Sequence, residues 1–166
     1  MVINIFDRTI NAKVFVDWKH TLAFGLGSGL ARTAPGTWGT LSAVPFCVAL
    51  WWWLPAWLFA LTLVVLAMFG VWLCDVVAKD LGVHDHGGIV WDEWVGYGTA
   101  LWALPLQWYW PLLAFVVFRV LDIAKPWPIS WCDKKVHGGF GVMLDDVAAG
   151  VLSCVCLHIL SVVIAG

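Results

Sequence analysis

Long apolar runs constrain the fold of this chain more than any other feature, because charged side chains occur only between these runs or at their ends. The apolar runs cover residues 40–54, 56–74, 94–106, 112–123 and 147–166. All Asp, Glu, Lys and Arg residues fall within 1–39, 75–93 and 119–146. A bilayer core takes about 20 residues of helix, and tilting or local thinning accommodates somewhat fewer. The pattern therefore predicts helices that run back and forth across a membrane.

The composition supports this interpretation, since 62% of the residues are hydrophobic and only 12% are charged, against about a quarter charged in soluble domains. We expect an all-α integral membrane protein, a compact bundle of about four to five membrane-embedded helices with glycine-rich cytoplasmic loops. Residues 1–20 have no apolar core of signal-peptide length and are expected to form an N-terminal cytoplasmic segment. Residues 21–166 would form a single membrane-embedded domain that carries any catalytic site. The net charge of −2 and the lack of a basic run give no support to a nucleic-acid partner, and we expect none.

Two tryptophan-rich turns, 51–57 and 105–111, contain no charged residue. Indole rings of this kind favour the headgroup level of a membrane. If the spans alternate in direction, all charged segments lie on the opposite side, and their lysine and arginine content assigns that side to the cytoplasm.

Glycine-rich segments flank the apolar runs. Five glycines and a proline in 21–39 predict a turn-rich loop with exposed amides. Together with Ser28, Arg32 and Thr37, these amides could cradle a phosphate group. Close packing of a re-entrant segment explains the same glycines equally well. Gly138, Gly139 and Gly141 predict a second flexible loop.

Carboxylates are concentrated in the polar segments. Residues 79–93 alone hold four carboxylates, two histidines and a lysine, and such groups must be solvated, paired or bound to metal in an apolar protein. Asp145 and Asp146 open the last apolar run, where a helix dipole favours one negative charge. Two adjacent aspartates, with Asp92 and Glu93 in the equivalent position at another span, argue for a shared cation. Oxygen ligands favour Mg²⁺. Zinc is the alternative, but no histidine pair has i, i+4 spacing.

Basic residues accompany these carboxylates. Arg119 and Asp122 are three residues apart and share one face of a predicted helix, as a simple helix-end salt bridge requires. That salt bridge leaves Lys125 available to bind an anion.

Four blocks of the sequence resemble the phosphatidylglycerophosphatase A family. The blocks are Gly-Ser-Gly at 27–29 with Pro-Gly-Thr-Trp-Gly-Thr at 35–40, Gly-Val-His-Asp-His-Gly at 82–87 with Ile-Val-Trp-Asp-Glu at 89–93, the run 119–129, and the run 137–150. The similarity extends in order from about Leu22 to Gly150. Thr40 stands where a serine is often found, which is a conservative difference.

The resemblance implies a multi-pass, Mg²⁺-dependent phosphatase of the bacterial inner (cytoplasmic) membrane, with its active site facing the cytoplasm. Its anionic phospholipid substrate would be phosphatidylglycerophosphate, hydrolysed to phosphatidylglycerol and phosphate in phospholipid biosynthesis. The hypothetical metal ligands are Asp85, Asp92, Glu93, Asp122, Asp145 and Asp146. The hypothetical phosphate-binding groups are Lys79, Arg119 and Lys125, beside the glycine loop with Ser28, Arg32 and Thr37. The hypothetical acid–base residues are His84, Asp85, His86 and His137.

Two other classes compete with an enzyme. A transporter or channel would use the carboxylates for cation passage, yet the charges collect on one side and no polar route crosses the predicted bilayer. A non-catalytic lipid-binding subunit would have little use for so many carboxylates beside an anionic headgroup.

Overall fold

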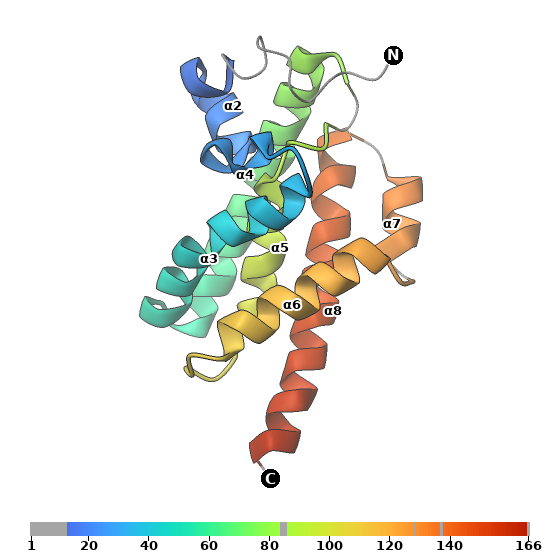
Figure 1. Cartoon of the computed structure of the whole chain (residues 1–166). Coiled ribbons are helices and arrows are strands. Elements are labelled where there is room, and N and C mark those ends of the chain that lie inside the picture. The colour runs from blue at the N-terminus through green and yellow to red at the C-terminus, as the bar shows by residue number, and fades with distance from the viewer. Residues whose placement is uncertain (1–12, 84–85, 128, 137, 166) are drawn as a thin grey trace.

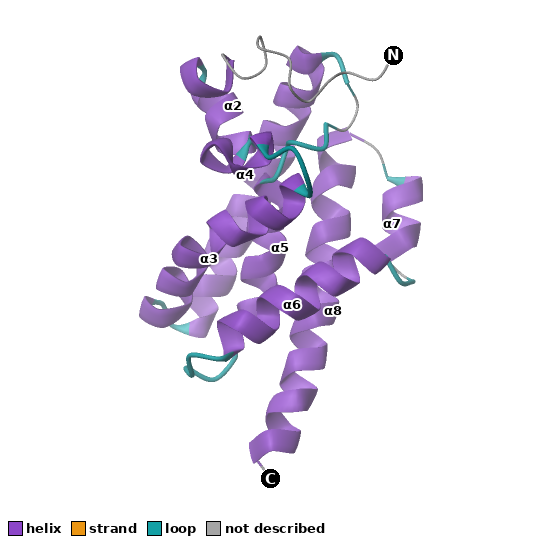
Figure 2. Ribbon diagram, in the orientation of Figure 1, coloured by secondary structure: helices purple, strands orange, loops and turns teal. Residues whose placement is uncertain are grey.

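A computed structural model describes residues 13–83, 86–127, 129–136 and 138–165, and contains no strand in this part of the chain. Figure 1 shows the arrangement of its helices, and Figure 2 shows that short loops connect them. The elements in order are α2 (Trp18–Ala23), the 3₁₀ helix η1 (Gly25–Leu30), α3 (Pro35–Trp53), α4 (Ala56–Leu81), α5 (Trp91–Leu101), α6 (Trp110–Ala124), α7 (Ile129–Lys135) and α8 (Gly138–Ala165). The predicted all-helical class is confirmed for the described residues.

The helix ends follow local sequence signals. Leu54 precedes Pro55 and is extended, with φ −97° and ψ 140°, so α3 ends there. Gly82 adopts the left-handed conformation after α4, and the Val83 amide donates back to the Ala78 carbonyl at 3.1 Å, which satisfies the end of that helix.

The two tryptophan-rich turns lie side by side at one end of the bundle. The Trp51 Nε1–H donates to the carbonyl oxygen of Leu104 at 3.2 Å, and the Trp102 Nε1–H donates to that of Ala56 at 3.0 Å. Because these bonds join the first turn to the residues that lead into the second, the helices that leave the two turns run back toward the same opposite end. The predicted alternation of direction is therefore present.

Helix α5 lies at the centre of the bundle and packs against α3, α4, α6 and α8. Its Tyr97 is fully buried in a core shared with Trp110 and Phe118. A second core joins α4 and α8 through Leu73 and Met143. This central position matters because the first turn of α5 carries Asp92 and Glu93.

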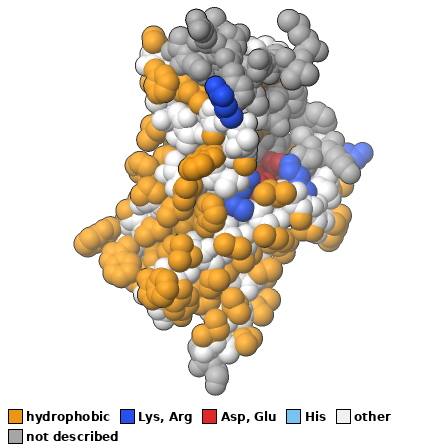
Figure 3. Space-filling view, viewed as in Figure 1, with side chains coloured by type: hydrophobic (Ala, Val, Ile, Leu, Met, Phe, Trp, Pro, Cys, Tyr) orange, Lys and Arg blue, Asp and Glu red, His pale blue; other side chains and the backbone are white. Residues whose placement is uncertain are grey.

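Two of the described helices, α4 and the 138–164 part of α8, are long and apolar enough to cross a membrane. Helix α5 has only 11 residues, about 16 Å of rise. Many large hydrophobic side chains are nevertheless exposed, among them Trp53 and Trp57. In Figure 3 hydrophobic side chains cover the lower part of the visible face, whereas the visible acidic and basic side chains lie above it. The expected number of membrane-embedded helices, four to five, stays a prediction.

The prediction of a turn-rich loop at 21–39 was right in part, since Gly25, Leu26, Gly27 and Ala34 have positive φ, and the prediction of a flexible loop at 138–141 was wrong. Residues 21–39 contain the end of α2, all of η1 and the first turn of α3, and Gly138, Gly139 and Gly141 form the start of α8. The physical reason is close packing. A Cβ at Gly139 would overlap the Val71 carbonyl oxygen of α4, and a Cβ at Gly39 would lie 2.5 Å from Val90 Cβ. These glycines let helices and loops approach each other, which offsets their low helix propensity.

Candidate functional site

Three carboxylates from two helices converge inside the bundle. Asp92 and Glu93 of α5 and Asp146 of α8 each offer one oxygen, and these oxygens all lie within 4.8 Å of one another. Glu93 and Asp146 are buried. Among the described residues, the Glu93 Oε2 and Asp146 Oδ2 atoms are shielded from solvent and have no hydrogen-bond partner. We call Asp92, Glu93 and Asp146 the carboxylate cluster.

The start of α8 places Asp146 in this cluster. Because α8 begins at Gly138, Asp145 and Asp146 lie two turns inside the helix rather than at its first turn. The interpretation that the helix dipole stabilises one of them was therefore wrong, since that effect is confined to the first turn. Both aspartates are buried, with 8% and 4% of their surface exposed.

Helix α6 adds Arg119 and Asp122 to the site. The Arg119 Nη1 lies 2.7 Å from Asp122 Oδ2 and 3.9 Å from Glu93 Oε1. Asp122 in turn lies close enough to Asp146 for the two carboxyl groups to interact. The predicted Arg119–Asp122 salt bridge is thus present, but it also touches the carboxylate cluster and is not merely a helix-end pair.

Lys125 follows α6 and reaches α8. Its Nζ lies 2.7 Å from Asp145 Oδ2. The Lys125 backbone is left-handed, with φ 42° and ψ 55°. This conformation costs a residue that has a Cβ about 1–2 kcal/mol of conformational free energy. The turn before Pro126 therefore directs the ammonium group toward the site at some energetic cost.

The first turn of α3 packs against the same residues. A Cβ at Gly36 would overlap Glu93 Oε1 and would lie 3.1 Å from Arg119 Nη2. The Thr40 Oγ1–H donates to the Gly36 carbonyl at 2.8 Å and fixes this turn. The positive end of the α3 dipole consequently faces the arginine and the carboxylates. Sequence reasoning missed this role of Gly36, although a Pro-Gly-Thr helix start was the available signal.

The site holds more carboxyl groups than cations. Five carboxylates, Asp92, Glu93, Asp122, Asp145 and Asp146, lie in or beside the cluster, with Arg119 and Lys125 as the cations that contact them. Mutual repulsion between shielded carboxylates a few ångströms apart is strong, since effective dielectric constants in proteins are far below that of water. Additional positive charge would relieve this repulsion.

The remaining predicted site residues lie elsewhere or make other contacts. Ser28 Oγ is 3.0 Å from Ser42 Oγ, which also accepts the Trp94 Nε1–H at 3.1 Å, so Ser28 joins a packing contact. Thr37 is half-buried beside Gly36, and Arg32 is exposed. Lys79 is exposed and binds Asp75 at 2.6 Å.

His86 is the predicted acid–base residue within the described part of the chain. It is buried, its ring lies 5.4 Å from that of Phe24, and its Nδ1 accepts the Gly88 amide at 3.1 Å. In the neutral ring this bond places the proton on Nε2. His84, Asp85 and His137 lie outside the described residues.

Comparison with known proteins adds independent information. A family model described as Phosphatidylglycerophosphatase A matches residues 21–161. A phosphatidylglycerophosphatase A of Escherichia coli is 51% identical over 140 residues, covering 84% of this chain and 81% of that protein. One of Haemophilus influenzae is 46% identical over 137 residues, covering 82% and 84% respectively. No solved structure matches significantly.

Proposed function

The chain belongs to the phosphatidylglycerophosphatase A family, and we propose that it hydrolyses phosphatidylglycerophosphate to phosphatidylglycerol and phosphate with one Mg²⁺ held by the carboxylate cluster. As a family member it is a phosphoric monoester hydrolase. The observation that carries the proposal is the position of Arg119, whose Nη1 lies 3.9 Å from Glu93 Oε1 of the carboxylate cluster. One site thus combines groups for a hard cation with a group for phosphate.

The donor set supports Mg²⁺. The three candidate ligands are carboxylate oxygens within 4.8 Å of one another, and two oxygens bound to Mg²⁺ lie at most about 4.2 Å apart. Small side-chain rotations would close this difference. The buried Glu93 Oε2 and Asp146 Oδ2 atoms, which lack hydrogen bonds to the described residues, would gain a partner. Such an ion supplies charge neutralisation and activation of water when bound.

Arg119 and Lys125 would bind the phosphate. The Arg119 guanidinium is a planar fork that matches phosphate oxygens, and its buried Nε has no hydrogen-bond partner among the described residues. Lys125, which pairs with Asp145, would act as a point charge toward the phosphate. Because both groups are already in place, they can stabilise the negative charge that grows as the ester bond breaks. The α3 N-terminus at Gly36 adds backbone dipoles to the same region.

Proton transfer to the leaving glycerol oxygen would fall to His84, His86 or His137. The Nε2 proton of His86, favoured by the Gly88 amide on Nδ1, suits a donor role. Asp85 stays a further candidate, either as a metal ligand or as a proton-transfer residue. Four other predicted headgroup-binding side chains would have to move before they could reach the headgroup. Lys79 and Ser28 would break the contacts described above, and Arg32 and Thr37 would turn from their present positions.

We place the protein in the bacterial inner membrane as a multi-pass protein whose site faces the cytoplasm. The two long apolar helices and the uncharged tryptophan-rich turns, remote from the carboxylate cluster, support this placement. The same separation argues against the alternative of a cation transporter or channel. The described acidic and basic side chains provide no chain of polar groups toward those turns.

The experiment is phosphate release by purified protein in detergent with phosphatidylglycerophosphate, measured with added Mg²⁺, without it, and after EDTA. Phosphatidic acid, another membrane phosphomonoester, serves as the comparison substrate. We expect turnover of phosphatidylglycerophosphate that EDTA abolishes and Mg²⁺ restores. Turnover unaffected by EDTA would refute the role of the metal. No turnover under any condition would refute the proposed reaction.

A further inference from the structure

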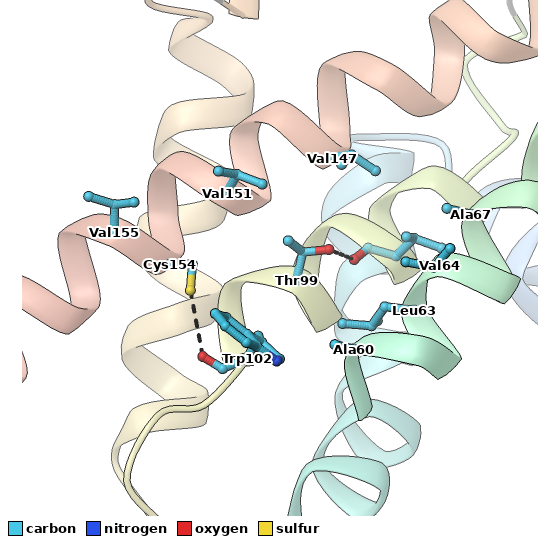
Figure 4. A pocket seen from close by; sticks show the side chains of 11 residues that line it. Ala60, Leu63, Val64, Ala67, Thr99, Trp102, Val147, Val151, Cys154 and Val155 are labelled. Atoms are coloured by element: carbon cyan, nitrogen blue, oxygen red, sulfur yellow. Dashed lines mark hydrogen bonds between the residues drawn. The ribbon is translucent and has the colours of Figure 1, made fainter. Parts of the chain in front are cut away.

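An apolar groove of about 350 Å³ runs between α4, α5 and α8. Figure 4 shows its walls, with Leu63 and Val64 on α4, Thr99 on α5, and Val147 and Val151 on α8. The side-chain polar atoms of Thr99 and Cys154 on these walls form hydrogen bonds within the protein. Thr99 Oγ1–H donates to the Val95 carbonyl at 2.8 Å, and Cys154 Sγ–H donates weakly to the Trp102 carbonyl at 3.5 Å. The groove therefore presents hydrocarbon to whatever enters it.

One end of the groove lies at the level of the carboxylate cluster along α5 and α8. Val147 directly follows Asp146 on α8, and Val95 lies one turn after Asp92 on α5. From Val147 to Val155 the α8 wall is about 12 Å long, at about 1.5 Å per residue. Trp102 stands at the far end, where its Nε1–H bond to the Ala56 carbonyl fixes it. A ligand that fits both regions must be charged at one end and apolar along its length.

We propose that this groove binds one acyl chain of the phospholipid substrate and so aligns the phosphate with the carboxylate cluster. This inference rests on the proposed function. The occupant is the substrate rather than bulk lipid or a second copy of the chain, because only the substrate carries a phosphomonoester for Arg119 and Lys125 in the same molecule. Burial from water contributes little here, since lipid tails are as apolar as the groove wall. The expected contribution is orientation, where a misplacement of about 1 Å can reduce the rate about 100-fold.

Two matched pairs of variants test the inference. Val64 and Val65 are neighbours on α4 with 55% and 56% of their surface exposed, but only Val64 lines the groove. On α8, Val151 lines the groove and Val162 does not, and both are exposed. Val64→Trp and Val151→Trp would fill the groove, whereas Val65→Trp and Val162→Trp add the same ring outside it.

Activity is measured on phosphatidylglycerophosphate with long acyl chains and with four-carbon acyl chains. We expect the two groove variants to lower kcat/KM on the long-chain substrate about tenfold or more and to leave the short-chain value unchanged. The two control variants should match the wild type on both substrates. Equal behaviour of Val64→Trp and Val65→Trp, or an equal loss on both substrates, would overturn the inference.

A binding measurement separates this inference from the proposed reaction. Phosphatidylglycerophosphate with a diazirine in one acyl chain is photolysed with the full-length protein, and labelled peptides are identified. Labelling of the groove walls that Val64→Trp suppresses and Val65→Trp does not would support the inference even if the wild type released no phosphate. Equal labelling by a diazirine phosphatidylcholine would identify the occupant as bulk lipid and overturn it.

Discussion

Gly150 of α8 lies so close to the backbone of Gly96 on α5 that a Cβ at position 150 would overlap the Gly96 carbonyl oxygen. The same Cβ would stand 2.9 Å from Thr99 Cβ. Asp146 lies one turn before Gly150, and Asp92 lies about one turn before Gly96. This crossing of two helices therefore sets the distance between the carboxylates that they carry.

Gly150→Ala is predicted to separate α5 from α8, because the atom in the way is backbone and cannot rotate aside. Overpacking of this kind destabilises by about 1–3 kcal/mol, and phosphate release should fall about 10- to 100-fold. Thermal unfolding in detergent and kcat/KM are measured together. Val162→Ile, which adds a methyl to an exposed position of the same helix, is the control. A wild-type unfolding temperature and kcat/KM in Gly150→Ala would show that α5 and α8 can lie farther apart than we infer without loss of stability or activity.

Gly36→Ala is predicted to separate activity from stability. The added Cβ would meet the ends of two side chains, Glu93 Oε1 and Arg119 Nη2, and these can move away without unfolding the protein. Their displacement disturbs the phosphate site, so we expect phosphate release to fall about tenfold or more with little change in the unfolding temperature. A loss of stability as large as that of Gly150→Ala would argue for a structural role only.

Lys125 allows its backbone and its charge to be tested separately. Lys125→Gly and Lys125→Ala both remove the ammonium group beside Asp145, so both should lower kcat/KM. Only glycine relieves the left-handed conformation with φ 42°, and the glycine variant should be more stable than the alanine variant by about 1 kcal/mol. Full activity in either variant would remove Lys125 from the site.

Asp92→Asn is predicted to abolish phosphate release while the protein still inserts into membranes, because the amide keeps the shape of the side chain and loses its charge. The control is Asp17→Asn at the N-cap of α2, where asparagine caps as well as aspartate does. Both variants are compared by membrane fractionation and phosphate release. Near-normal turnover in Asp92→Asn would exclude Asp92 as a ligand.

Much of the fold could be predicted from the sequence, because hydrophobic runs and prolines act locally. Pro55 and the tryptophan-rich turns predicted where the chain reverses, and that reversal brought 92–93, 119–122 and 145–146 to one end. Asp92, Glu93 and Asp146 could be selected as candidate ligands because few other groups in so apolar a chain are charged.

The glycine-rich segments could not be predicted, since their structure depends on distant neighbours. Gly36 and Gly139 favour loops on propensity alone, yet both lie in helices where another element leaves no room for a side chain. Ser28 illustrates the same difficulty, because only the folded chain shows that Ser42 and Trp94 form its hydrogen-bonded neighbourhood. Contacts of this kind have no local signature.

The most direct test of the central claim is Mn²⁺ binding to the purified protein, followed by electron paramagnetic resonance with Mg²⁺ as competitor. We predict one saturable site in the wild type and in Asp17→Asn, displaced by Mg²⁺, and an affinity lower by about tenfold or more in Asp146→Asn. Equal affinity in the wild type and Asp146→Asn would contradict the claim that Asp92, Glu93 and Asp146 hold the cation.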